Sequence, residues 1–273
     1  MKKYVYCLLL LCLFLSPAWA QQPENLMPHL ADTVVIEQLA DTTVQVTQPK
    51  KLSVVARKAA VPILLIGLGI THMEDGGLFE GSHGLRRVVQ REYAGYNTKI
   101  DDYLYHTPVA MAVGLNLAGV RGEHHFTEQA ILLGMTHLLN RTLTNNLKGL
   151  TAIERPDGSS NDAFPSAHTS TAFAYASFFH KEYGSRSIWY SVAGYSFATA
   201  TGTLRILNDK HWLSDVLVGA GIGILSTEVV YMVYPFIQKK IAQSHLKKQQ
   251  NNLVFMPYYT GAAGGLALVW QLK

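Results

Sequence analysis

The sequence has little charge and almost no cysteine. Only 15% of its 273 residues are Asp, Glu, Lys or Arg, and the formal net charge is +4 at pH 7. It has no block of Lys and Arg interleaved with aromatic residues, so it gives little support for nucleic-acid binding. Both cysteines, Cys7 and Cys12, lie in the first twenty residues. Once that segment is removed, the chain would have no disulfide, no thiolate nucleophile and no cysteine metal site.

The first twenty residues have the composition of a secretory signal peptide. Lys2 and Lys3 precede an apolar run over residues 4–15, and Ala18 and Ala20 form a small-x-small cleavage pattern. We expect cleavage after Ala20 and export to the cell envelope of a bacterium, with the active site in the periplasm. An uncleaved anchor would need a longer apolar run of about 20 residues.

Six apolar segments of helical length follow a polar stretch. They cover residues 59–73, 107–120, 128–143, 169–179, 187–204 and 213–237. Their short connections predict an all-α six-helix bundle. We expect four parts, which are a signal peptide (1–20), a polar arm (21–52), a helical domain (53–245) and a short C-terminal tail (246–273). The tail is rich in Gly and aromatic residues, and this composition is compatible with a strand or a hairpin.

The apolar segments favour membrane association only slightly. A span needs about 20 apolar residues, whereas most of these segments are shorter or carry Thr, Ser, His or Asn, and Glu228 lies in the last one. Basic residues near 181–186 and 239–248 suit cytoplasmic ends. Six spans after a cleaved signal peptide would place the 181–186 loop outside, against that bias. A soluble periplasmic bundle therefore stays open beside the membrane-associated one.

Three polar clusters lie at the ends of apolar segments. They are Lys148 with Arg155 and Pro156, then Pro165-Ser166-Ala167-His168, then Arg205 with His211 and Asp215. Three cations and the free N–H groups at a helix start are the donors that phosphoryl oxygens bind. Two histidines can divide nucleophilic attack from protonation of the leaving group. His211 and Asp215 are four residues apart, on one helical face, so the carboxylate can fix the histidine tautomer.

The patterns K-x6-RP, PS-x-H and R-x5-H-x3-D resemble the three-part signature of the type 2 phosphatidic-acid phosphatases. That superfamily also includes bacterial class A acid phosphatases and vanadium haloperoxidases. The resemblance implies a nucleophile at His211, oriented by Asp215, and a general acid at His168. It implies no metal and no cofactor. The phosphoryl oxygens would be held by Lys148, Arg155, Ser166, the Ala167 backbone N–H and Arg205.

Two positions depart from the family pattern. Ala167 stands where the family usually has Gly, and Leu204 stands where it has Ser. Ala keeps the backbone N–H, so the first change should be tolerated unless the turn requires a positive φ. The second removes a hydroxyl next to Arg205, which would loosen one contact.

The resemblance implies a metal-independent phosphatase for phosphorylated lipids. Its substrates would be phosphomonoesters or pyrophosphates such as those of lipid A, polyprenyl pyrophosphate or phosphatidate-type lipids. Three alternatives stay open, which are a soluble broad-specificity periplasmic acid phosphatase, a vanadate-dependent haloperoxidase and a non-catalytic envelope protein. The retained Lys148, His168, Arg205, His211 and Asp215 argue against the last.

Other polar or glycine-rich patterns have simpler interpretations. Glu123-His124-His125 lacks the HExxH spacing of a zinc site, so a polar loop is expected there. Gly219-x-Gly221-x-Gly223 fits close helix packing better than dinucleotide binding. His106, His137 and His180 are interpreted as structural.

Overall fold

A computed structural model describes residues 51–73, 81–249, 254–259 and 264–269. The expected signal peptide (1–20) and nearly all of the expected polar arm (21–52) lie outside the described residues. The chain divides into two compact units, one up to Thr227 and one from Glu228 onward. The first unit holds the helices that carry the three polar clusters.

The described residues contain eight helices, two more than the six expected. They are α2 (Lys51–Thr71), α3 (Gly81–Glu92), α4 (Asp101–Leu104), α5 (Thr107–Leu117), α6 (Phe126–Thr151), α7 (Ala167–Tyr183), α8 (Ile188–Leu207) and α9 (Leu213–Gln249). Each of the six apolar segments coincides with one of these helices. The additional two are α3, which is rich in Arg and therefore lacks an apolar run, and α4, which is a single turn.

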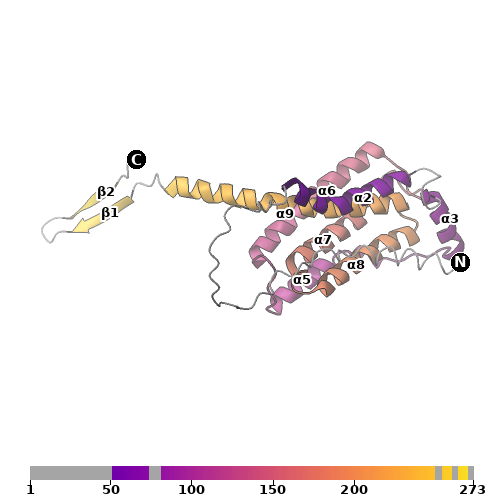
Figure 1. The fold of residues 1–273 in the computed structure, drawn as a ribbon, viewed down its shortest axis with the longest axis horizontal. Coiled ribbons are helices and arrows are strands. Elements are labelled where there is room, and N and C mark those ends of the chain that lie inside the picture. Colours follow the sequence, from indigo (N-terminus) through magenta and orange to yellow (C-terminus); the bar gives the residue numbers. More distant parts are fainter. Residues whose placement is uncertain (1–50, 74–80, 250–253, 260–263, 270–273) are drawn as a thin grey trace, which may run out of the picture. The chain divides into compact units, whose positions relative to one another are not determined.

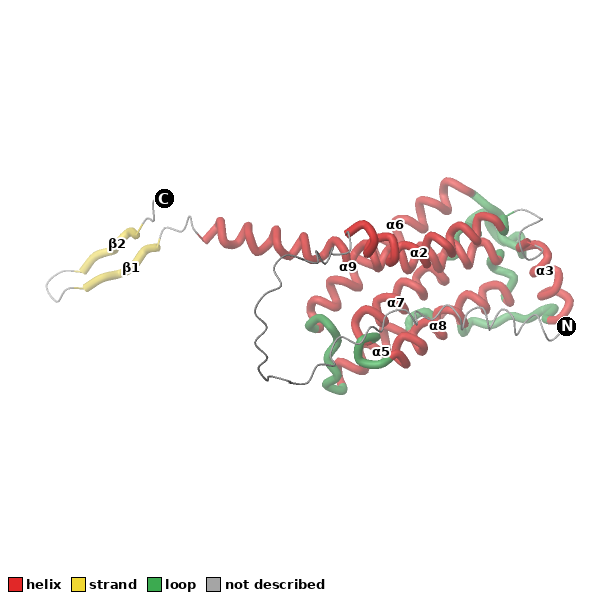
Figure 2. The backbone as a smooth tube through the Cα atoms, in the orientation of Figure 1, coloured by secondary structure: helices red, strands yellow, loops and turns green. Residues whose placement is uncertain are grey.

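Helix α7 lies in the middle of the helical unit, between α6 and α8 (Figure 1). It packs against α4, α5, α6 and α8, and most of its residues are buried. Small side chains such as Ala172, Ala174 and Ala176 are fully buried on it, beside Phe178 and Phe179. These alternating small and large residues allow neighbouring helices to pack on several sides of α7. In the described part of this unit the connections between helices are loops without strands (Figure 2).

Glycines bring α9 close to α7. A Cβ on Gly219 would lie 2.7 Å from the Ser166 carbonyl oxygen, and one on Gly223 would lie 2.8 Å from the Ala174 backbone nitrogen. Real Cβ atoms do not approach so closely, so only Gly permits this contact. The expectation that the glycines around residue 221 serve close helix packing is confirmed. The contact also places the start of α9 against the start of α7.

The second unit contains the end of α9 and a pair of strands. Strands β1 (Val254–Tyr259) and β2 (Gly264–Val269) pair in antiparallel fashion, with Val254 opposite Val269. The first unit is therefore all-α over its described residues, as expected, and the two described strands lie in the C-terminal tail. Among the described helices, only Leu213–Ile241 within α9 is long and apolar enough to cross a membrane, a property that core helices of soluble proteins share.

Candidate active site

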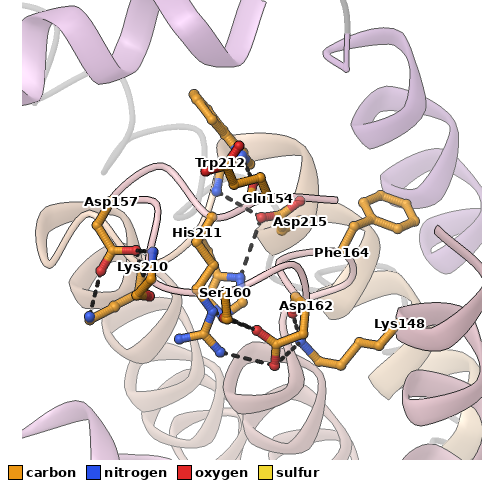
Figure 3. Close-up of polar contacts among 12 residues, drawn as sticks. Lys148, Glu154, Asp157, Ser160, Asp162, Phe164, Lys210, His211, Trp212 and Asp215 are labelled. Carbon is orange, nitrogen blue, oxygen red and sulfur yellow. Dashed lines mark hydrogen bonds and ion pairs between the residues drawn. The ribbon is translucent and has the colours of Figure 1, made fainter. Parts of the chain in front are cut away.

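Lys148 and Arg155 converge on one carboxylate. Lys148 lies in the last turn of α6, and the residue that caps this helix, Ala152, is in the left-handed conformation with φ 46°. The chain then turns back, and Arg155 donates from Nε and Nη2 to the two carboxylate oxygens of Asp162 at 2.9 and 3.2 Å. The Lys148 Nζ donates to the Asp162 carbonyl and lies 3.6 Å from its carboxylate (Figure 3). These two cations are thus placed to share an anion.

The second cluster forms the start of α7. Ser166 is the N-cap, and its hydroxyl accepts a hydrogen bond from the Thr169 backbone N–H at 3.4 Å. The Ser166 backbone N–H donates to the Asp215 carbonyl at 3.0 Å, which ties α7 to the first turn of α9. Ala167 is the first residue of α7, and among the described non-glycine residues only Ala152 and Asp209 have a positive φ. The turn therefore does not require Gly at position 167.

The third cluster contains a buried histidine–aspartate pair. Nδ1 of His211 lies 3.3 Å from Oδ2 of Asp215, and that oxygen also accepts the Trp212 backbone N–H at 2.8 Å (Figure 3). Both side chains are 1% exposed. The two residues meet as expected, but not on one helical face, because α9 begins at Leu213 and His211 lies in the turn before it. The contact leaves Nε2 of His211 as the ring nitrogen that does not face the carboxylate.

Arg205 is buried with one donor unused. Its Nη1 donates to Oδ2 of Asp101 at 2.7 Å, and its side chain is only 8% exposed. Its Nε has no hydrogen-bond partner among the described residues. A buried donor without an acceptor costs about 1–3 kcal/mol, so an acceptor such as a phosphoryl oxygen would relieve that cost.

The three clusters share one electrostatic environment. Burial lowers the pKa of His211 well below its usual value, and the nearby Arg205, Lys148 and Arg155 lower it further. Burial also lowers the pKa of Lys148, although Asp162 opposes that effect. At neutral pH the His211 ring is therefore neutral and keeps a lone pair. A phosphate dianion would offset the charge of the surrounding cations.

Acidic residues that sequence reasoning missed complete the site. Oδ1 of Asp102 lies 3.2 Å from Nε2 of His168. Asp101, beside it in α4, accepts from Arg205 and, at 3.0 Å, from the Asn208 side chain. Each of these contacts joins positions distant in sequence, so no local pattern indicates them. Asp162 lies three residues before the PS-x-H motif in the sequence. Its contacts with Lys148 and Arg155, however, could not be predicted from that position.

A further layer of ion pairs borders the site. Arg86 of α3 makes a bidentate contact of 2.9 Å with Asp209, whose φ is 56° in the turn between α8 and α9. Lys210 donates to Asp157 at 2.5 Å. These pairs hold the 152–166 loop and the 208–212 turn against neighbouring elements.

Three histidines outside the three clusters have partners away from the site. His124 lies 2.9 Å from the buried carboxylate of Glu182 near the other end of α7, and Nδ1 of His137 lies 2.9 Å from the Tyr175 hydroxyl. His180 contacts the Ser191 hydroxyl at 2.6 Å. These contacts fit structural roles.

A family comparison covers the region that holds all three clusters. Residues 129–239 match the model of the PAP2 superfamily. The resemblance expected from the three motifs is thereby confirmed over these residues. All eight site residues predicted from the sequence lie within the matched range of the PAP2 domain, whereas Asp101 and Asp102 lie before it.

This chain is also similar to a curated relative and to two solved structures. It is 34% identical over 245 residues to a lipid A 1-phosphatase of Porphyromonas gingivalis, a match that covers 87% of this chain and 52% of the relative. The chain thus spans about half the length of the curated relative it matches.

The solved structures have lower sequence identity. A transmembrane PAP2 type phosphatidylglycerolphosphate phosphatase from Bacillus subtilis is 17% identical with a TM-score of 0.50, covering 67% of this chain and 97% of that one. The structure of Aquifex aeolicus LpxE is 22% identical with a TM-score of 0.43, covering 59% and 98%. The Bacillus subtilis likeness supports a PAP2 fold for the helical unit.

Proposed function

We propose that this chain is a metal-independent phosphatase that removes phosphate from a lipid phosphomonoester or pyrophosphate. The observation that carries the proposal is the position of His211. Its ring is buried beside Asp215 and close to Lys148, Arg155 and Arg205. A neutral imidazole among three cations suits attack on a phosphoryl group, because the cations bind the oxygens while the ring supplies the electron pair.

Binding of the phosphoryl group would use the donors that converge on the site. Lys148 and the guanidinium groups of Arg155 and Arg205 supply charge-assisted hydrogen bonds. The Ser166 hydroxyl and the Ala167 backbone N–H lie at the start of α7, where the helix dipole favours an anion. The unpartnered Nε of Arg205 gives one donor that an oxygen of the substrate can satisfy.

The reaction would proceed in two displacements. In the first, Nε2 of His211 attacks phosphorus, the bond to the lipid oxygen breaks, and His168 donates its proton to that oxygen. In the second, water attacks the phosphohistidine, the N–P bond breaks, and His168 takes the proton from the water. Asp215 would hold the His211 ring and stabilise its positive charge while the bond to phosphorus exists.

The substrate is inferred to be a lipid of the lipid A type. Support comes from the relative named lipid A 1-phosphatase, with which this chain shares 34% identity. Other lipid phosphates, including polyprenyl pyrophosphate and phosphatidate-type lipids, are the alternatives. A soluble, broad-specificity acid phosphatase would use the same residues without a preference for an acyl chain.

The proposed location is the bacterial cell envelope, with membrane association and a periplasmic active site. Large apolar side chains are exposed on α2, α5, α6 and α8, namely Ile63, Leu64, Leu117, Leu138, Leu150 and Trp189. Such exposure supports contact with lipid. Carbonate washing of membranes should leave the protein in the pellet, and complete release would favour the soluble alternative. The mature N-terminus should be Gln21 if residues 1–20 are a signal peptide.

The test of function uses purified full-length protein and lipid A carrying phosphate at both ends. Mass spectrometry should show loss of one phosphate with wild type and none with His211→Ala. Turnover should persist in EDTA. Halide oxidation with added vanadate, without phosphate release, would contradict the phosphatase and indicate the haloperoxidase alternative. Release of phosphate from short soluble esters but not from lipid would contradict the lipid substrate and leave the phosphatase activity standing.

A further inference from the structure

We propose that Asp102 is a positioning residue for His168, which it holds as the proton donor to the leaving oxygen. The proposal rests on the proposed function, because it assigns a partner to the acid of that reaction. Oδ1 of Asp102 lies 3.2 Å from Nε2 of His168, and the two side chains are 49% and 32% exposed. The sequence predicted one aspartate–histidine pair, and the structure contains a second.

Buried contacts fix the backbone that carries Asp102. Its neighbour Asp101 is 1% exposed and accepts hydrogen bonds from Arg205 and from the Asn208 side chain. The Asn208 amide also donates to the Thr98 carbonyl at 2.9 Å. The turn α4 is thereby anchored to α8 through Asp101. Asp102 follows Asp101 in the chain, and its side chain reaches His168 at the start of α7. The buried hydrogen bonds of Asp101 therefore fix the backbone position of Asp102.

Tyr105 fixes the other side of the histidine. Its ring meets the His168 ring edge-on, with centroids 5.2 Å apart and planes at 90°. This contact restricts rotation of the imidazole. With Nε2 bound to Asp102, Nδ1 is the ring nitrogen left to face the leaving oxygen. His211 has the opposite arrangement, since its Nδ1 faces Asp215.

The charge of Asp102 opposes the effects that would deprotonate His168. The charged groups that act on this ring are Arg205 from α8 and Asp101 and Asp102 from α4, and Tyr105 packs beside it. Burial and Arg205 lower the pKa of His168, whereas Asp102 and Asp101 raise it. A general acid must be protonated before the leaving group departs. Asp102 therefore keeps a larger fraction of His168 in the active, protonated form.

The kinetic test compares Asp102→Asn with wild type on two lipid-like esters. Dodecyl phosphate has a poor alkoxide leaving group that needs a proton, and 4-dodecylphenyl phosphate has a better one. We expect turnover of dodecyl phosphate to fall roughly ten- to a hundredfold and turnover of the aryl ester to fall less than about threefold. The basic limb of kcat/KM for dodecyl phosphate should move to lower pH, because the pKa of His168 falls.

Two further variants complete the kinetic design. Asp102→Glu keeps the charge and should recover part of the lost dodecyl phosphate turnover. Glu92→Gln removes an exposed carboxylate at the end of α3 and should leave both rates unchanged. Equal losses on the two esters with an unmoved pH profile would show that Asp102 is only structural and would overturn the proposal. Wild-type rates in Asp102→Asn would overturn it as well.

A titration separates this proposal from the proposed function. In protein labelled at histidine, the signal lost in His168→Gln identifies the His168 ring, and its pKa is read by NMR with no substrate present. The pKa should be lower in Asp102→Asn than in wild type. An unchanged pKa would overturn the role of Asp102 even in an active phosphatase. A lowered pKa in a protein that hydrolyses no phosphate ester would contradict the proposed function and leave the Asp102–His168 pair established.

Discussion

Nδ1 of His211 lies 3.3 Å from Oδ2 of Asp215, and neither side chain is more than 1% exposed. The same oxygen accepts the Trp212 backbone N–H, so the first turn of α9 fixes the carboxylate. A carboxylate held on Nδ1 favours the tautomer whose proton is on that nitrogen and whose lone pair is on Nε2. The geometry therefore directs Nε2, the proposed nucleophilic nitrogen, away from the carboxylate.

Replacing His211 with Ala should abolish turnover. We expect a fall of at least about a thousandfold, because the variant lacks the proposed nucleophile of the phosphoenzyme. Acid-labile labelling of the protein by a ³²P-labelled substrate should disappear in the variant. Near-normal activity with His211→Ala would show that the nucleophile has been assigned to the wrong residue.

Local relationships in this site could be predicted from the sequence. The four-residue spacing of His211 and Asp215 predicts that they meet, and they do, although His211 lies in the turn before α9. Ser166 precedes an apolar helical run, so its N-cap role follows from side-chain chemistry. The small residues at 219, 221 and 223 indicate a close helix contact. The six apolar segments likewise coincide with helices because burial of apolar surface drives their formation.

Distant relationships could not be predicted in this way. The contact of Asp101 with Arg205 joins positions 104 apart, and it forms only because α4 packs on α8. The two adjacent aspartates resemble an exposed turn when read alone, yet Asp101 is buried and Asp102 is half-exposed. Helix α3 was missed because its arginines interrupt the apolar pattern, and one of them pairs with Asp209.

Replacing Asp162 with Asn should strengthen inhibition by inorganic phosphate. The Asp162 carboxylate neutralises Arg155 and lies near Lys148. Burial raises its pKa, but the hydrogen bonds from Ser160 and Arg155 and the charge of Lys148 lower it well below its usual value. Without that carboxylate, Arg155 and Lys148 keep their full charge for bound phosphate. The inhibition constant of inorganic phosphate should therefore fall about three- to tenfold. It is measured by competition against dodecyl phosphate at pH 7.

A control separates charge from position in that experiment. Asp157→Asn removes a carboxylate that pairs with Lys210 at the border of the site, and it should change phosphate inhibition less than Asp162→Asn does. Weaker inhibition in Asp162→Asn would mean that the carboxylate mainly holds Arg155 and Lys148 in place.

The pH dependence of kcat/KM should show an acidic optimum for substrates with poor leaving groups. Burial and Arg205 lower the pKa of His168 from its ordinary value. A group with a lowered pKa loses its proton at lower pH, so the acid is lost, and the rate declines, as pH rises through that lowered pKa. The decline should begin below about pH 6.5, the value for a free histidine. A rate profile for dodecyl phosphate that stays flat between pH 6 and 8 would contradict the assignment of His168.

Gly223→Ala should destabilise the helical unit, whereas Gly134→Ala should not. A Cβ on Gly223 would lie 2.8 Å from the Ala174 backbone nitrogen, and backbone cannot move aside as a side chain can. Overpacking of this kind costs about 1–3 kcal/mol. Gly134 lies in α6 with nothing within 4 Å of a Cβ, so Ala there should stabilise the helix by about 0.5–1 kcal/mol. Thermal unfolding in detergent should move in opposite directions for the two variants, and similar shifts for both would contradict the close approach of α9 to α7.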